Sequence, residues 1–169
     1  ALLAIFLAVI FSVPLGILSA IRPDGWLDYA ARVFTMVGIA IPNFLVAILL
    51  ILLLLRVFDW LPALGYVEFW HDPLKNLEQM IFPALALAFY DMAFIARVTR
   101  SSMMEVLRED YMRTARAKGL PERLVLTRHG LKNAFLPVLT VFGLQVGFSI
   151  GGLVVMERAF NLPGLGNFL

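Results

Sequence analysis

Three long blocks without a charged residue dominate this sequence. They cover residues 1–21, 33–55 and 134–156. Each block reaches the roughly 20 apolar residues that an α-helix needs to cross the hydrocarbon core of a bilayer. Hydrophobic residues make up 61% of the chain and charged residues 15%, against roughly 45–50% and about 25% in ordinary soluble domains. The sequence therefore predicts a membrane protein and excludes a soluble enzyme, a disordered chain and a simple nucleic-acid-binding domain.

A fourth apolar segment is less regular than these blocks. It runs from Met80 to Ala96, and Asp91 interrupts it. Extended by about one turn toward Arg97, it is long enough to cross a bilayer. Pro42 lies in the middle of the second block and predicts a kink there, because it removes a backbone donor. We expect four membrane spans, at about residues 1–21, 33–55, 80–100 and 134–156. The predicted fold is all-α: a polytopic membrane helical bundle that forms a single domain over residues 1–169.

Positive charge is concentrated between the third and fourth predicted spans. Residues 97–133 hold nine Lys or Arg against four acids, whereas residues 56–79 hold two against four. The positive-inside rule then places residues 97–133 in the cytoplasm and residues 56–79 outside. Alternation places residues 22–32 in the cytoplasm as well. The formal net charge of +2 thus hides a local excess in one loop, and we expect no nucleic-acid partner.

The 97–133 loop has the pattern of two helices joined by a sharp turn. Residues Val98 to Lys118 contain neither Gly nor Pro. Gly119 is typical of a helix stop, and Pro121 of the first turn of a new helix. A short helix that is joined rigidly to a span can move that span when a partner pushes on it. The same basic residues also fit a simpler role, in which they only fix topology and contact anionic lipid headgroups.

Two stretches of this loop resemble the cytoplasmic signature of binding-protein-dependent ABC transporter permeases. They are Tyr111–Leu120 (YMRTARAKGL) and Arg128–Pro137 (RHGLKNAFLP). Four further segments resemble the dipeptide, oligopeptide and nickel branch of this family: Ala96–Met103, Phe160–Gly166, Pro42-Asn43-Phe44 and Trp60-Leu61-Pro62. The resemblance covers essentially the whole chain and implies the permease fold of a type I ABC importer. Such permeases typically have further spans, so we interpret the chain, which begins at Ala1 inside an apolar run, as a fragment.

The general permease motif is Glu-Ala-Ala, three residues, Gly, nine residues and Ile-x-Leu-Pro. With Gly119 as its glycine, only Ala115, Gly119 and Leu131 match strictly, and the departures resemble the variant of the peptide branch. The resemblance implies that about Pro121 to His129 is the coupling helix, which docks in a cleft on a cytoplasmic ATPase. The residues implied in this contact are Arg113, Thr114, Ala115, Ala117, Gly119, Leu120, Pro121, Glu122, Arg123, Arg128 and His129.

The resemblance implies a transport subunit rather than an enzyme. The chain would form half of the translocation path of an ATP-driven importer for dipeptides, oligopeptides, nickel chelates or similar small solutes. Its implied partners are a second permease subunit, two cytoplasmic ATP-binding subunits, an extracytoplasmic solute-binding protein and the lipid bilayer of a bacterial or archaeal cell (inner) membrane. ATP is expected only in the partner subunits, because here no Gly is followed by Lys and then Ser or Thr. We expect no cofactor in this chain.

Three glycines recur every four residues in the fourth predicted span, at Gly143, Gly147 and Gly151. Residues at this spacing share one helix face and allow neighbouring backbones to approach closely. The pattern predicts helix packing, either within the subunit or at the permease–permease interface.

Three polar residues within the spans are candidates for the translocation path: Asp91, Asn43 and Gln145. A carboxylate is costly at this depth, so Asp91 must face protein or water. It fits either a pathway residue or a carboxylate paired within the protein. It also motivates an alternative function, an ion-coupled secondary transporter or channel that uses Asp91. No metal site is expected, because the chain has no cysteine and its two histidines, His71 and His129, lie far apart.

Overall fold

The computed structural model describes residues 2–61 and 65–164, apart from the side chain of Ile150. The regular elements are α1 (Leu2–Ile21), α2 (Trp26–Ala40), α3 (Asn43–Phe58), α4 (Pro73–Leu107), α5 (Asp110–Ala117), α6 (Glu122–Leu124), the π-helix η1 (Val125–Leu131) and α7 (Lys132–Ala159). Every regular element of the described chain is helical, which confirms the predicted all-α fold.

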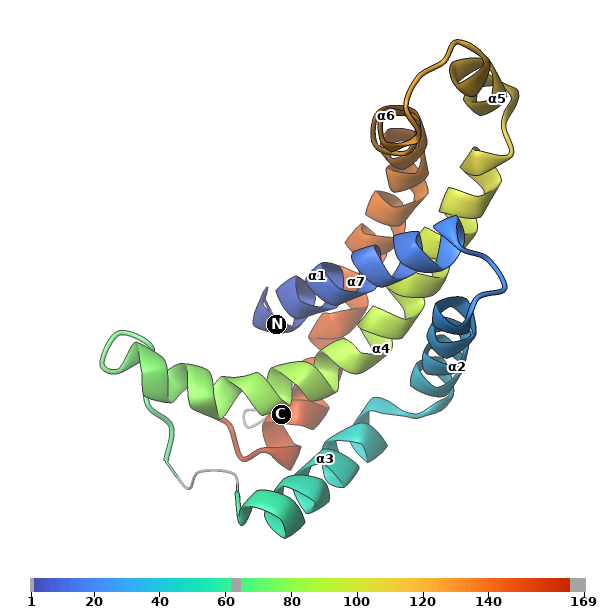
Figure 1. The fold of residues 1–169 in the computed structure, drawn as a ribbon. Helices are drawn as coiled ribbons and strands as arrows, with labels where there is room; N and C mark the ends of the chain where they lie inside the picture. Colours follow the sequence, from blue (N-terminus) through green and yellow to red (C-terminus); the bar gives the residue numbers. More distant parts are fainter. Residues whose placement is uncertain (1, 62–64, 165–169) are drawn as a thin grey trace.

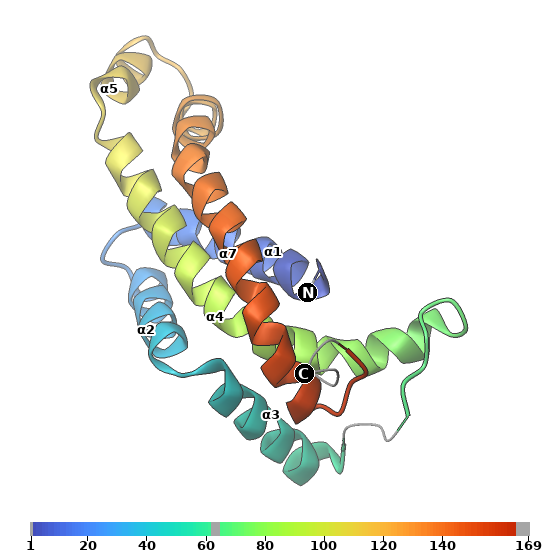
Figure 2. The same ribbon diagram turned by 180° about the vertical axis from the view of Figure 1, so that it is seen from behind.

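Helix α4 is the centre of this fold. Helices α1, α2, α3 and α7 all contact it, and Figures 1 and 2 show it running diagonally through the molecule. The apolar core follows α4 through Leu87, Met92 and Ile95. Between these larger side chains, α4 buries five alanines: Ala84, Ala86, Ala88, Ala93 and Ala96. Small side chains let neighbouring backbones approach closely, which is how helices gain packing energy inside a membrane.

Two glycines outside the predicted stripe make the closest approaches to α4. A Cβ atom at Gly16 of α1 would lie 2.7 Å from the carbonyl oxygen of Ala96, and one at Gly38 of α2 would lie 2.4 Å from the Cβ of Ala93. Neither position therefore has room for a larger side chain without movement of a helix. The backbones of α1 and α2 therefore pack closely against α4 at these two glycines.

Residues 33–55, predicted as one kinked span, are divided between two helices. Helices α2 and α3 meet at an angle of 108°. Ile41, which precedes a proline, is extended (φ −91°, ψ 123°), as is Pro42 itself (φ −61°, ψ 141°). Proline disfavours a helical conformation in the residue before it and lacks an amide hydrogen, so the helix ends here instead of bending. The sequence predicted the position of the irregularity at Pro42 correctly, but it predicted a kink where the helix in fact ends.

Three helical stretches of the described chain are long and apolar enough to cross a membrane. They are α1, α4 and the continuous stretch from Glu122 to Ser149, and the count rises to four if the bent pair α2–α3 is one span. Helix α4 is longer than the predicted third span. It starts at Pro73, where Asp72 caps it by accepting a hydrogen bond from the amide of Lys75 (3.1 Å), and it continues to Leu107.

The helix predicted over Val98 to Lys118 is also different in the structure. Its first part continues α4, and the chain then breaks at Arg108 and Glu109 before α5 begins. Glu109 is extended (φ −65°, ψ 147°) and serves as the N-cap residue of α5. The helix that crosses the core therefore projects directly into the 97–133 loop, with no linker between them.

Replacing Gly38 by valine tests the seating of α2 on α4. Overpacking a filled core typically costs about 1–3 kcal/mol, and here the new side chain would meet Ala93. We expect a clearly lower unfolding temperature for Gly38→Val in the full-length subunit. Ala30→Val is the matched control, because Ala30 is an exposed small residue on the same helix. Equal unfolding temperatures for the two variants would contradict this packing.

Candidate functional site

The 97–133 loop forms a folded projection at one end of the molecule. Figures 1 and 2 show α5 and α6 beyond the ends of α4 and α7, away from both described chain ends. Met112, Ala115 and Val125 are buried there and pack with the half-buried Val106 and Leu107. This small apolar core joins the end of α4 to α5 and η1. The loop is therefore held against the helical bundle by its own side chains.

A second apolar cluster ties this projection to the first helix. Met103 of α4, Ala134 of α7 and Ala20 of α1 are buried together. Gly130 lies close by, since a Cβ atom there would be 3.2 Å from Cε of Met103 and 3.3 Å from Cε of Met112. The glycine lets η1 approach both methionines. The start of α7 is thereby fixed to α4 and α5 at the same level.

The turn between α5 and α6 is closed by glycine geometry and an ion pair. Gly119 has φ +75°, a left-handed conformation that favours glycine. Across the turn, Nη2 and Nε of Arg116 donate to the two carboxylate oxygens of Glu122 at 2.9 and 3.1 Å. The Arg116 guanidinium holds the pKa of the Glu122 carboxyl below its usual range. Because both side chains are substantially exposed, the pair orders the turn more than it stabilises the fold.

The segment predicted as a short coupling helix is continuous with α7. It begins as α6, passes through the π-helix η1 and enters α7 without a break. Figure 1 views α6 nearly end-on but α7 from the side, so the helical axis turns between them. The amide of Asn133 also donates to the Tyr111 hydroxyl (2.9 Å), which ties α5 to the start of α7. A displacement of this segment is therefore passed to α7 through helical backbone.

The residues predicted for the coupling contact lie almost entirely on the surface of this projection. All eleven are exposed except Ala115, which is buried in the small core, and His129, which is half-buried. The exposed set combines cations with apolar side chains, and it includes Leu120 together with a neighbour that the list omitted, Leu124, which is 44% exposed. Leucines placed on a packed loop among cations form a surface that can bind a protein partner.

The glycine stripe of the fourth predicted span does not pack within the described chain. A Cβ atom at Gly143, Gly147 or Gly151 would meet no described atom within 4 Å. No described helix packs against this stripe, so the predicted packing, within the subunit or between permeases, stays a prediction. These glycines lie on the face of α7 turned away from α4, whereas a Cβ atom at the adjacent Gly152 would lie 3.0 Å from Cδ1 of Leu87 on α4. The interface with a second permease is left as a proposal.

Asp91 and Gln145 are brought together, and Ser149 joins them. Asp91 is buried on α4, and its two carboxylate oxygens accept hydrogen bonds of 2.8 Å from Nε2 of Gln145 and Oγ of Ser149. Both donors come from successive turns of α7, so the contact fixes the register of α7 against α4. Asn43 does not join this group, and its buried Oδ1 has no hydrogen bond to any described residue. A place for these residues in the translocation path stays a prediction.

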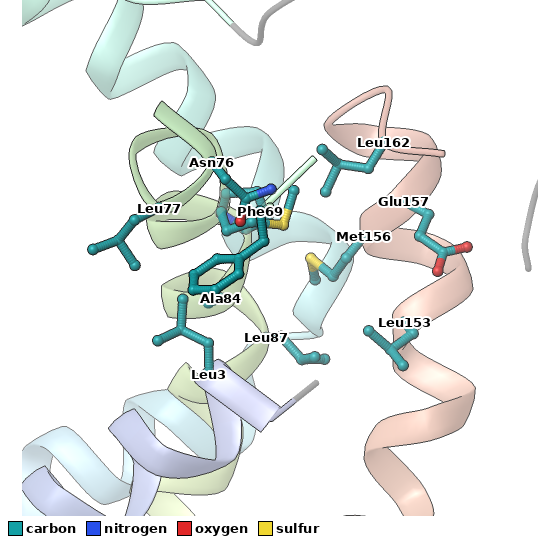
Figure 3. A pocket seen from close by; sticks show the side chains of 12 residues that line it. Leu3, Phe69, Asn76, Leu77, Ala84, Leu87, Leu153, Met156, Glu157 and Leu162 are labelled. Atoms are coloured by element: carbon teal, nitrogen blue, oxygen red, sulfur yellow. The ribbon is translucent and has the colours of Figure 1, made fainter. Parts of the chain in front are cut away.

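An apolar cavity of about 260 Å³ lies far from the loop, between α1, α4 and α7. Figure 3 shows Leu3, Phe69, Leu87 and Met156 gathered around it. Asn76 also lines it, but its amide donates to the carbonyl of Val67 (2.6 Å) and to the hydroxyl of Tyr66 (3.2 Å). Glu157 is the charged residue of the lining, and the remaining surface of the cavity is mainly hydrocarbon.

Sequence reasoning missed a buried ionic cluster at the loop end of α1, α2 and α4. The side chain of Asp28 is fully buried. Its carboxylate accepts hydrogen bonds from Nε and Nη2 of Arg100 (2.6 and 3.0 Å), from Nη2 of Arg32 and from Oγ of Ser19. The spacing of Asp28 and Arg32, four residues apart, was a visible signal for one of these pairs. Nothing in the sequence pointed to Arg100, which is 72 residues away.

Known proteins similar to this chain are membrane transport components. Residues 12–169 match the family described as "Binding-protein-dependent transport system inner membrane component". The chain is 46% identical over 168 residues to the oligopeptide transport system permease protein AppB of Bacillus subtilis. This alignment covers 98% of the chain and 53% of that relative. It is 44% identical over 165 residues to the dipeptide transport system permease protein DppB of the same organism, covering 98% and 51%. A glutathione transport system permease protein, GsiC of Pectobacterium atrosepticum, is 44% identical over 162 residues, covering 96% and 50%.

The chain thus spans about half the length of these relatives. They support the interpretation as a transport permease and give no support to the ion-coupled alternative that uses Asp91.

Replacing Asp28 by asparagine tests the ionic cluster. The variant keeps the side-chain size but leaves two guanidinium groups around a neutral amide. Breaking a buried charge pair on one side costs about 3–5 kcal/mol, so we expect a large fall in the unfolding temperature of the full-length subunit. Asp24→Asn is the control, since the exposed side chain of Asp24 makes a surface pair with Arg32, worth about 1 kcal/mol or less, and the backbone amide that Asp24 donates to Asp28 is kept. Equal falls in the unfolding temperature of the two variants would show that the buried Asp28 cluster stabilises the fold no more than the surface pair does.

Proposed function

Because the chain belongs to the family of binding-protein-dependent transport system inner membrane components, we propose that it forms half of the translocation path of an ATP-driven ABC importer in the bacterial or archaeal inner membrane. A second permease subunit completes the path, two cytoplasmic subunits bind and hydrolyse ATP, and an extracytoplasmic solute-binding protein delivers the solute. The chain itself binds no ATP. The names of its relatives, which specify oligopeptides, dipeptides and glutathione, support peptides as the substrate class.

The geometry of the 97–133 loop is the observation that carries this proposal. An apolar core orders the loop, and an exposed surface remains beside that core around Gly119, Leu120 and Leu124. A loop that only fixed topology would need the cations but neither the core nor the exposed leucines. The partner that this surface fits is a folded protein with an apolar cleft and acidic rim. We assign that role to the ATP-binding subunit.

The loop can couple ATP hydrolysis to movement of the membrane helices because both of its ends continue into long helices. On one side it continues into α4 at Leu107, and on the other it continues through η1 into α7. When two ATP-binding subunits close around ATP, the loop docked on each of them is displaced. The displacement reaches α4 and α7 together, because the hydrogen bonds from Gln145 and Ser149 to Asp91 join these helices further along. The cavity between the two permeases then opens to the other side of the membrane.

The open glycine face of α7 is assigned to the second permease. Gly143, Gly147 and Gly151 meet no described atom of this chain, and the exposed Leu136 and Leu144 accompany them. Glycines at this spacing allow two helices to pack with close backbone contact. In this proposal they lie where α7 meets the partner permease, so they pack between subunits.

The substitution Leu124→Asp tests the coupling surface. The full-length subunit is reconstituted with its second permease, ATP-binding subunits and binding protein in liposomes, and ATP-driven peptide uptake is measured together with retention of the ATP-binding subunits. Burial of a charge in an apolar contact typically costs more than about 1.4 kcal/mol, so we expect uptake and retention to fall about tenfold or more. Unfolding of the isolated subunit is expected to change little, because Leu124 is exposed.

Leu74→Asp is the matched control for this experiment. Leu74 is an exposed leucine in the first turn of α4, at the end opposite Leu107, where α4 enters the loop. It should leave uptake and subunit retention unchanged. Full ATP-driven uptake in Leu124→Asp would refute the assignment of the coupling surface. Equal loss in the two variants would show that any added charge impairs the subunit.

A further inference from the structure

A cavity of about 240 Å³ lies where α1, α2 and α4 meet, at the end of the bundle next to the loop. Small residues on all three helices create the space: Gly16 on α1, Ala31 on α2 and Ala96 on α4. We infer that this cavity binds the phosphodiester headgroup of an anionic phospholipid from the cytoplasmic leaflet. The inference is independent of the solute that the importer carries.

The titratable side chains that line the cavity are all arginines: Arg32, Arg97 and Arg100. Asp28 does not line it but lies behind it, where it binds Arg32 and Arg100 and fixes their side chains. Cations held in place in advance lose little entropy when an anion binds. Guanidinium groups also match the geometry of phosphate oxygens. The cavity therefore has the chemistry of an anion site that is built before its ligand arrives.

The charge balance selects a ligand with one negative charge. Asp28 and Asp24 both pair with arginines of this group and offset two of the three positive charges. Arg97 is exposed and forms no hydrogen bond or ion pair with the described residues, so it supplies the charge that remains. A phosphodiester carries one negative charge at neutral pH, and a lipid such as phosphatidylglycerol carries no compensating cation.

Unused donors face the same space. Arg100 uses Nε and Nη2 for Asp28, and its Nη1 takes part in no hydrogen bond with the described part of the chain. Of the hydroxyl groups in the lining, Ser19 donates to Asp28 and Thr35 donates to the carbonyl of Arg32. The Ser101 hydroxyl forms no hydrogen bond with the described residues and is available to a ligand. Phosphate oxygens accept hydrogen bonds from guanidinium and hydroxyl groups alike.

The surroundings of the cavity favour a lipid over a free phosphate. Arg32 precedes the second predicted span and Arg97 and Arg100 end the third, so the cavity lies at the predicted cytoplasmic membrane boundary. Met36 lines the cavity and is 69% exposed, and it continues into the exposed apolar side chains of Val33 and Val37 on α2. A headgroup in the cavity would therefore have its acyl chains against an apolar helix face.

Lipid retention tests this inference. The full-length subunit is placed in nanodiscs of phosphatidylcholine and phosphatidylglycerol, released, and analysed by native mass spectrometry for the lipids that remain bound. Removing one cation near an anionic headgroup costs about 1 kcal/mol, so Arg97→Gln should lower phosphatidylglycerol retention about fivefold. Arg22→Gln should leave it unchanged, because Arg22 is an exposed arginine at the same membrane face that does not line the cavity.

Two further arms make the test decisive. Ser101→Phe keeps every charge but fills the cavity mouth, and it should also reduce retention of phosphatidylglycerol, which keeps the test valid if Arg97→Gln is poorly folded. Excess inorganic phosphate should not displace the lipid. Retention that is equal in Arg97→Gln, Ser101→Phe and the unmodified subunit would overturn the inference. If the unmodified subunit retained phosphatidylcholine as well as phosphatidylglycerol, the inference that the site selects an anionic lipid would be overturned. Displacement of the lipid by inorganic phosphate would identify a free phosphate site instead.

Discussion

The close approach of neighbouring helices to α4 is the constraint on which the rest of this structure depends. Inside a bilayer, lipid tails are as apolar as leucine, so helices associate through dense packing and hydrogen bonds. Helix α4 meets this requirement with its buried alanines and with Gly16 and Gly38 on the opposing helices. Because α4 then continues to Leu107 without a break, whatever moves the loop also acts on the centre of the bundle.

Buried carboxylates join α1, α2 and α7 to α4 at two levels. Asp91 binds α7 through Gln145 and Ser149, and Asp28 brings the ends of α1 and α2 to Arg100. A carboxylate is expensive to bury, and here every carboxylate oxygen of Asp91 and Asp28 accepts at least one hydrogen bond. The two contacts differ in chemistry. The deeper one uses neutral donors from one helix, whereas the one nearest the loop uses charged donors and leaves part of its arginine surface facing a cavity.

The sequence predicted what depends on local pattern and missed what depends on distant contacts. Apolar blocks predicted an all-α membrane protein, the loop signature predicted the family, and Gly119 predicted the turn that its positive φ requires. Pro42 marked an irregularity, but the local pattern did not predict that α2 and α3 would be separate helices at an angle of 108°. Gly143, Gly147 and Gly151 form a periodic pattern that predicts packing, whereas Gly16 and Gly38, which lie close against α4 in the described chain, belong to no periodic pattern. As a member of this permease family with several apolar helices, the chain is a multi-pass membrane protein.

The central claim is that the loop and α7 move as one body. Lys118 in the turn and Leu136 on α7 are both exposed and can carry spin labels. Pulsed electron paramagnetic resonance would then measure the distance between the turn and α7 in the complete importer. The account predicts one narrow distance distribution that is the same without nucleotide and with ATP bound, because α6, η1 and α7 are continuous and Asn133 binds Tyr111. A distribution that shifts or broadens when ATP binds would contradict it, since the loop would then act as a flexible tether.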